Sequence, residues 1–535
     1  MDFDVIVIGS GFGGAITGCR LAEANYKVLI LERGRRWDKD AYPREPEDAW
    51  IWSESEPETY NGWLQMRLFP GMGVAQGAGV GGGSLIYANV SAEAPKPVFE
   101  SGWPQEITYQ ELKPHYDRVA KFMNVQQIPL NQLAPRTKLM QEGATKIGEP
   151  QRFKLVELAV SFDPNLSYNF EDPPDESKSH KFINAQGVEQ GFCAHLGTCD
   201  IGCHAQAKNT LDLNYIPWAE KHGAEVRPLH LVTNIEPVTG GYIVHYDRLE
   251  NGQRIPGKQS ARIVIVAASS LGSTELLLQC RDLFKSLPNI GPALGQNWSS
   301  NGDFLTPAYY SDRHIWPERG PTITSAIDFL DRSQEGQIFW IEDGGFPNLF
   351  DGFTKSAAHH GVGGKHAQAL QGSRASSLIQ QLNEAVQNIN PVNQIMPWFA
   401  QGADAADGVL RLKKKWWLFG PKELHLDWDV TRSRPVFDAT LRMHEKLSKA
   451  TGGVSVVLPT WSFAHDLITP HPLGGCKLGN TAADGVVNHE GEVFGYRNLY
   501  VADAAIIPRA LGVNPSRTIG ALAERIASRI ISNAR

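Results

Sequence analysis

Three glycines near the N-terminus have the spacing that binds the pyrophosphate of a dinucleotide. Gly9 would allow a tight turn, Gly11 would let a pyrophosphate approach the backbone, and Gly14 would let the following helix pack closely. The first N–H groups of that helix would face the phosphates. Glu32 follows roughly twenty residues later, where a carboxylate accepts hydrogen bonds from ribose hydroxyls and repels the 2′-phosphate of NADP. The pattern predicts an FAD or NAD site without separating the two.

Two apolar runs would position these residues. Residues 5–8 lead directly into Gly9, and residues 28–31 end at Glu32. Both runs have the uninterrupted apolar character of parallel strands that are buried on both faces. Because strand, glycines, helix and acid occur in the expected order, a glycine-rich turn without a ligand is the less favoured alternative.

Two later segments have the same character. Residues 263–268 form an apolar run that leads into a helix-patterned stretch ending at Cys280, and residues 499–503 precede a predicted helix from about 516 to 532. We expect one parallel sheet assembled from all three parts of the chain. The intervening stretches mix predicted strands (337–341, 423–430) and helices (109–123, 375–389) without βα alternation, which favours a second, antiparallel sheet covered by helices.

Length and composition describe a globular protein of two or more domains. The chain has 535 residues, of which 42% are hydrophobic and 20% charged, and its formal net charge of −7 offers no basic surface for nucleic acid. No run approaches the roughly 18 apolar residues of a membrane span, and the N-terminus is itself the first strand. We therefore expect a cytoplasmic protein without a signal peptide.

Three of the six cysteines, Cys193, Cys199 and Cys203, share a short loop with two histidines. Their spacing matches no standard zinc or iron–sulfur pattern, which favours free thiols over a metal site or a disulfide. No metal is expected.

Residues 77–84 contain five glycines. Such a density permits positive φ and close approach of a flat ligand, so we expect this loop to contact an isoalloxazine ring or a pyrophosphate rather than to act as a flexible hinge.

Two residues near the C-terminus combine a polar side chain with a rigid backbone. His471 lies between two prolines, which fixes the direction of the imidazole, although a buried structural histidine would look the same. Asn514 precedes Pro515 at the start of the last helix, where a helix N-cap is the alternative.

Taken together, the chain resembles the glucose–methanol–choline (GMC) oxidoreductase family, in its cholesterol-oxidase-like branch, over essentially its whole length. The resemblance implies an α/β protein with a discontinuous Rossmann-like FAD-binding domain and an α+β substrate domain built on a mainly antiparallel sheet. The first domain would comprise residues 1–40, 200–305 and 463–535, with the loop 71–91 contacting the flavin, and the second residues 41–199 and 306–462. The segments that carry the resemblance are 9–14 with Glu32, 77–84, 267–275, 471–476, 498–503, and 512–518 running into 521–525.

The resemblance also implies an activity. A hydrophobic alcohol, sterol-like or long-chain, would be oxidised to a carbonyl, with the hydride passing to flavin N5 and with oxygen or another acceptor taking the electrons. His471 and Asn514 would hold and deprotonate the hydroxyl, because alcohol oxidation needs a positioned proton acceptor. Glu342 is the candidate for an additional base, with Asp343 as the alternative and a surface carboxylate pair as an equally compatible reading.

The same resemblance places FAD along the chain. Val232 would meet its adenine end, and Asn301 and Gly302 would approach the flavin. The cofactor should be non-covalent, because the glycine-rich loop lacks the histidine to which other family members attach flavin. The expected contacts are Gly9, Gly11, Phe12, Gly13, Gly14, Glu32, Gly77, Gly79, Gly82, Gly83, Ser84, Asn89, Val232, Ala267, Asp503, Ala504, Asn514, Pro515 and Ser516.

The sequence departs from the pattern of the family at two places, and it allows one alternative function and one alternative role for a surface segment. Tyr87 stands where the characterised steroid oxidases have an asparagine, and the cysteine-bearing loop resembles family members whose substrates are uncertain. A lyase or light-driven decarboxylase on the same fold is the alternative function. The tryptophan-bearing segment 413–419 could contact a membrane surface, although a strand with a basic flank is more common.

Overall fold

The computed structural model describes residues 1–45, 47–346, 392–414, 422–457, 461 and 465–533. The helix predicted at 375–389 and the tryptophans of segment 413–419 lie outside these residues. No helix in the described ranges combines the length and apolar character that crossing a bilayer requires.

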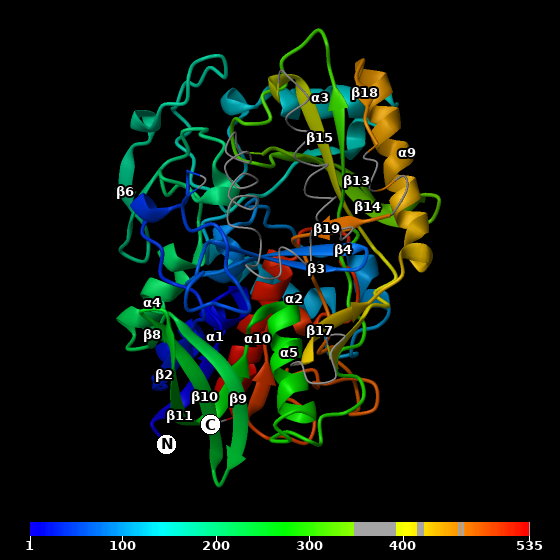
Figure 1. Cartoon of the computed structure of the whole chain (residues 1–535). Coiled ribbons are helices and arrows are strands. Elements are labelled where there is room, and N and C mark those ends of the chain that lie inside the picture. The colour runs from blue at the N-terminus through cyan, green and yellow to red at the C-terminus, as the bar shows by residue number, and fades with distance from the viewer. Residues whose placement is uncertain (46, 347–391, 415–421, 458–460, 462–464, 534–535) are drawn as a thin grey trace.

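A seven-stranded sheet forms the lower part of the molecule in Figure 1. Its strand order is β8-β2-β1-β11-β10-β9, and β20 pairs with β11. The pairs β1–β2, β1–β11, β2–β8 and β11–β20 are parallel, as the buried apolar runs predict. The strands are β1 (Phe3–Ile8), β2 (Val28–Leu31), β8 (Glu225–Arg227), β9 (His230–Val238), β10 (Gly241–Glu250), β11 (Gln253–Val266) and β20 (Leu499–Val501).

Helices pack around this sheet. α1 contacts α10 and α4, and α10 contacts α2, so the first and last helices of the chain lie side by side (Figure 1). α10 begins at Ser516, as predicted. These helices are α1 (Phe12–Glu23), α2 (Tyr109–Phe122), α4 (Tyr215–Lys221), α5 (Ser269–Asp282) and α10 (Ser516–Asn533).

A six-stranded antiparallel sheet forms the upper part in Figure 1, in the order β18-β12-β15-β14-β13-β5. Helices α3 and α9 pack against each other and against the sheet, which confirms the expected antiparallel sheet with helical cover. The elements are β5 (Phe153–Leu155), α3 (Pro135–Lys146), β12 (Phe304–Tyr309), β13 (Ser325–Gln334), β14 (Gln337–Asp343), β15 (Ile395–Gly402), α9 (Arg434–Thr451) and β18 (Val454–Ser455).

A small three-stranded sheet lies between the two large ones (Figure 1) and consists of β3 (Leu64–Phe69), β4 (Met72–Gly77) and β19 (Leu467–Thr469). β4 and β19 are parallel, with Thr469 opposite Val74. Parallel strands end at the same edge of a sheet. The glycine-rich loop after β4 and His471 after β19 are therefore brought to one edge.

Two hairpins complete the strands: β6 (Lys181–Ile183) with β7 (Glu189–Gly191), and β16 (Val409–Lys414) with β17 (Lys422–Asp427). The strand predicted at 423–430 was too long. β17 ends at Asp427, and the Asp429 side chain accepts the N–H of Thr431, which closes a turn of 3₁₀ helix over Val430–Arg432. Short polar side chains that bond to the nearby backbone favour such turns over strands.

Candidate active site

Two glycines of the N-terminal turn are explained by close packing. A Cβ on Gly14 would lie 2.0 Å from the carbonyl oxygen of Gly9, and one on Gly13 would lie 1.9 Å from that of Ala502. No side chain fits at such distances, so α1 packs closely on β1 and on the end of β20. Gly9 itself has φ +98°, the tight turn expected from the sequence.

Gly11 is different, because the space around it is open. A Cβ there would come no nearer than 3.9 Å to any other atom, the Cα of Gly82, and a Cβ on Gly83 would meet nothing within 4 Å. The first turn of α1 has no side-chain cap and no acidic residue. Uncapped N–H groups beside bare glycine backbone fit a pyrophosphate.

Glu32 directly follows β2 and hydrogen-bonds to the residues of this turn. Its carboxylate accepts hydrogen bonds from the N–H of Ser10 (3.0 Å), the Oγ of Ser10 (2.7 Å) and the N–H of Gly34 (2.9 Å). A carboxylate has about four acceptor positions, so capacity remains for a ribose hydroxyl. The N–H of His230 also donates to the Glu32 carbonyl, which places the start of β9, with Val232, beside this end of the site.

The glycine-rich loop is ordered by specific hydrogen bonds. The N–H of Gly81 donates to Ser10 Oγ (3.1 Å), and Ser84 Oγ donates to the Gly81 carbonyl (2.7 Å) while accepting the N–H of Leu211 (3.0 Å). The loop is therefore held against the N-terminal turn and is not a flexible hinge. The hydroxyl of Ser84, expected to contact FAD, is used within the protein.

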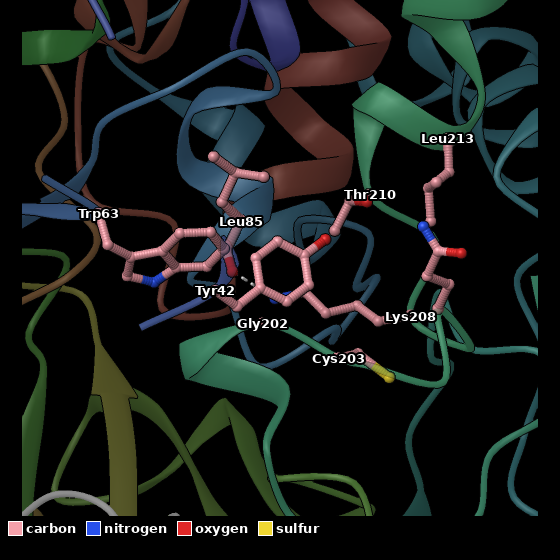
Figure 2. A pocket seen from close by; sticks show the side chains of 9 residues that line it. Tyr42, Trp63, Leu85, Gly202, Cys203, Lys208, Thr210 and Leu213 are labelled. Carbon is pink, nitrogen blue, oxygen red and sulfur yellow. Dashed lines mark hydrogen bonds between the residues drawn. The ribbon is translucent and has the colours of Figure 1, made fainter. Parts of the chain in front are cut away.

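Lys208 stabilises this loop through hydrogen bonds to backbone carbonyls, a role that was not predicted from the sequence. Its buried ammonium donates to the carbonyls of Leu85 (2.9 Å) and Cys199 (2.6 Å) and lies 4.9 Å from the centre of the Tyr87 ring. Burial lowers its pKa to about 8. Figure 2 shows Lys208 and Leu85 in a cavity of about 10 Å³, which has room for a single water molecule and not for a substrate.

Asn89 is an unsatisfied polar residue next to the loop. It is fully buried with φ +68°, and neither amide atom has a hydrogen-bond partner among the described residues. Buried amides without partners are rare and call for an explanation, such as a ligand that the chain alone does not supply.

Asp503 joins the ends of two parallel strands. Its carboxylate accepts the N–H groups of Ser269 (2.8 Å) and Ala505 (2.8 Å) and the Oγ of Ser273 (2.5 Å). Burial raises its pKa to about 6. Ala504 follows directly, and Ala267 lies at the end of β11, so these predicted contacts gather at the carboxyl edge of the sheet, where α/β proteins bind ligands.

His471 is oriented by a buried carboxylate. Its Nδ1 lies 2.8 Å from Asp303 Oδ1, and its backbone N–H donates to Thr469 Oγ1 (2.9 Å). Nε2 makes no hydrogen bond within the part of the chain that the structure describes. The imidazole is 15% exposed, so this nitrogen is accessible to a small molecule.

Asn514 faces Glu342 and is not a helix N-cap. Its Nδ2 lies 3.5 Å from Glu342 Oε2, and its Oδ1 is buried without a partner in the described ranges. The loop before it is held by Asn301, whose Oδ1 accepts the N–H groups of Leu511 (2.9 Å) and Gly512 (3.1 Å) and whose Nδ2 donates to the Val513 carbonyl (2.9 Å). The Asn301 side chain, expected to approach a flavin, is thus engaged by this loop.

Glu342 and Asp343 are fully buried, so their interpretation as a surface pair was wrong. Successive side chains of a strand point to opposite faces, and β14 continues through both residues. Glu342 accepts from Gln401 Nε2 (3.0 Å) on the face that carries Asn514. Asp343 accepts the N–H groups of Thr324 and Ser325 on the other face. The structure therefore places Glu342, and not Asp343, beside Asn514.

Phe399 lies near both Glu342 and His471. It lies opposite Glu342 in the register of β14 and β15, and its ring centre is 6.3 Å from that of His471. Phe399 is half-buried, with His471 near its ring and Glu342, the hydrogen-bond partner of Asn514, opposite it in the sheet. Such a set can hold a hydroxyl and accept its proton.

Comparisons with known proteins agree with this geometry. Residues 427–523 match the GMC oxidoreductase family, and residues 7–42 match an NAD(P)-binding Rossmann-like domain. The chain is 29% identical to a cholesterol oxidase of Acinetobacter baumannii, over 99% of this chain and 94% of that protein. It is 22% identical to the long-chain-alcohol oxidase FAO4B of Arabidopsis thaliana, over 99% and 67% respectively. Pyridoxine 4-oxidase from Mesorbium loti shares the fold, with a TM-score of 0.63, 15% identity and 98% coverage of both chains.

The chain carries the GMC oxidoreductase domain at residues 427–523 and resembles the cholesterol-oxidase-like branch of that family over nearly its whole length.

Its cofactor is FAD. The residues of this structure fit that cofactor. The open space at Gly11 and Gly83, the uncapped start of α1 and the unpartnered amide of Asn89 offer backbone and side-chain donors without a protein acceptor.

The cysteine-bearing loop holds free thiols. All six cysteines lie in described segments and are unpaired by disulfides, and Cys193 and Cys199 are buried. Within the described residues, no group of three or more His, Cys, Asp or Glu side chains could hold a metal ion. Burial raises the pKa of Cys193 and Cys199, which disfavours reactive thiolates.

Burial raises the pKa of Glu342 well above its usual value, which predicts a pH-dependent stability. Above the unfolded-state pKa of about 4.3, the unfolded chain releases a proton that the folded state retains, so the contribution of Glu342 to stability falls as pH rises. Relative to the wild type, the unfolding free energy of Glu342→Gln should increase by up to about 1.4 kcal/mol per pH unit above pH 5.

Chemical denaturation at pH 5, 6 and 7 measures this difference. Glu100→Gln is the control, because its side chain is 63% exposed and should give no such trend. A pH-independent difference between Glu342→Gln and the wild type would mean that Glu342 is ionised in the folded protein.

Proposed function

We propose that this FAD-dependent alcohol oxidoreductase oxidises a hydrophobic alcohol, sterol-like or long-chain, to a carbonyl compound. The observation that carries the proposal is the unpaired Nε2 of His471 in a buried site with Asn514, Glu342 and Phe399. Two relatives whose names are cholesterol oxidase and long-chain-alcohol oxidase support the substrate class.

Each residue of the candidate site would have a separate role in the reaction. The amide of Asn514 holds the substrate hydroxyl, and Nε2 of His471 takes its proton, since a neutral imidazole is a suitable base near neutral pH. Phe399 provides apolar surface for the carbon next to the hydroxyl. Burial favours the neutral form of Glu342, whose Oε2 accepts from Asn514 Nδ2 and orients the amide. FAD, when bound, supplies the hydride acceptor.

We further propose that FAD binds non-covalently between residues 1–40, 200–305 and 463–535, and that residues 41–199 and 306–462 enclose the substrate. All strands of the seven-stranded sheet come from the first set of ranges, which supports this division. In the same proposal, oxygen or another acceptor takes the electrons from the reduced flavin.

Anaerobic stopped-flow mixing of the holoenzyme with alcohols tests the proposed activity. Cholesterol and a long-chain primary alcohol should bleach the oxidised flavin at least about ten-fold faster than ethanol or glucose, because an apolar pocket gains about 0.8 kcal/mol per buried methylene. Readmission of oxygen, or of a quinone or dye, then identifies the acceptor. A flavin that stays oxidised with every alcohol would reject the proposal and favour the lyase or decarboxylase alternative.

A further inference from the structure

Asp303 is a buried carboxylate that the sequence did not single out. It is 1% exposed, immediately precedes β12, and lies with Oδ1 2.8 Å from Nδ1 of His471. Its other oxygen, Oδ2, accepts from Thr469 Oγ1 at 2.5 Å. An ionised carboxylate can only accept hydrogen bonds, so Nδ1 of His471 must be the protonated nitrogen of the ring.

We propose that Asp303 is a positioning residue that fixes the tautomer and direction of the His471 imidazole, so that the Nε2 lone pair faces the substrate hydroxyl. This inference rests on the proposed function for its catalytic consequence. When the hydroxyl O–H bond breaks and its proton moves to Nε2, the ring becomes a cation, and the adjacent carboxylate stabilises that cation.

The surrounding structure is built to hold this pair. Thr469, the last residue of β19, accepts the backbone N–H of His471 and donates its hydroxyl to Asp303, so one side chain fixes both partners. Two residues before Asp303, Asn301 holds the loop that precedes Asn514. The segment 301–303 therefore positions both residues that the proposed function assigns to the hydroxyl.

The geometry around the pair suits a carboxylate that accepts hydrogen bonds, because both of its oxygens face donors. Burial raises the pKa of Asp303, and the nearby His471 and Thr469 oppose that shift. Among the described residues, the buried titratable side chains on or next to the packed elements include Glu342 on β14, His444 on α9, Asp404 after β15 and Asp466 before β19. Burial favours the neutral forms of both Glu342 and His444, with the pKa of His444 lowered to about 3.

Asp303→Asn tests the proposal, because it removes the charge and keeps the shape. The amide can donate to Nδ1 and force the proton onto Nε2, the wrong tautomer for a base. We expect the limiting rate of flavin reduction to fall by about 10²-fold or more. We also expect the acid-side midpoint of its pH profile to move down by about one pH unit, because the cation loses its partner.

Asp404→Asn is the matched control, since Asp404 is also a buried carboxylate but accepts only from Ser299, Ser300 and Ala406. It should lower the melting temperature and leave the pH midpoint in place. The tautomer is read separately by ¹⁵N NMR of labelled histidine, with His471→Gln to assign the signal, and FAD content by absorbance.

The outcomes separate the two proposals. If Asp303→Asn leaves both the pH midpoint and the His471 tautomer unchanged, Asp303 has a structural role only and the inference is overturned. If the NMR signal changes tautomer as expected but no alcohol reduces wild-type FAD, the positioning role stands and the proposed function fails.

Discussion

Replacing His471 with alanine should slow the reduction of FAD by alcohols by about 10²-fold or more, because the substrate hydroxyl then has no positioned proton acceptor. In the proposed mechanism, Nε2 of His471 is the base, and Asp303, 2.8 Å from Nδ1, keeps the ring proton on Nδ1. The rate of flavin bleaching in anaerobic stopped flow measures the effect. Because the removed ring is partly exposed, added imidazole should restore part of the rate.

The control for this variant is His245→Ala. His245 lies on β10, is 33% exposed and contacts Glu236 on the neighbouring strand β9. The sheet of these two strands contains neither Glu342 nor β19, the strand before His471, so the loss of His245 should leave the rate unchanged. FAD content and melting temperature must be measured for both variants. An unchanged reduction rate in FAD-loaded His471→Ala would remove this residue from the mechanism.

The N-terminal nucleotide-binding unit could be predicted from the sequence because its determinants are local. The apolar runs, the glycines and Glu32 follow one another within about thirty residues, and each acts through its own backbone or its immediate neighbours. The parallel sheet could be predicted because residues 263–268 and 499–503 have the same apolar character of buried strands. The sequence predicted that an antiparallel sheet exists but not which strands pair in it, because strand pairing joins segments far apart in sequence.

The details of the candidate site could not be predicted in the same way. The His471–Asp303 pair joins residues 168 positions apart, and the Asn514–Glu342 pair joins residues 172 positions apart. The choice between Glu342 and Asp343 depends on which face of β14 meets Asn514, and a strand pattern that is apolar on both faces does not reveal this. Lys208 was missed because its partners are backbone carbonyls, which carry no sequence signal.

Replacing Gly11 or Gly13 with alanine should separate cofactor binding from folding, although the two glycines are only two positions apart. At Gly13 the new Cβ would lie 1.9 Å from the Ala502 carbonyl oxygen, so α1 must move and the free energy of unfolding should fall by about 1–3 kcal/mol or more. At Gly11 the backbone has φ −71° and the nearest atom is 3.9 Å away. The Gly11→Ala apoprotein should therefore be as stable as the wild type or slightly more stable.

FAD should nevertheless bind Gly11→Ala more weakly, because the added methyl group fills the space in which we expect the pyrophosphate to approach the backbone. A dissociation constant raised about ten-fold corresponds to about 1.4 kcal/mol of lost binding free energy. Fluorescence titration of the apoprotein with FAD measures the affinity, and thermal unfolding with and without FAD measures the stability. If Gly11→Ala binds FAD as tightly as the wild type, the pyrophosphate does not lie against Gly11, and the uncapped start of α1 loses its assigned ligand. If it loses both affinity and apoprotein stability, the space at Gly11 is needed for folding, and its openness is not a sign of the cofactor.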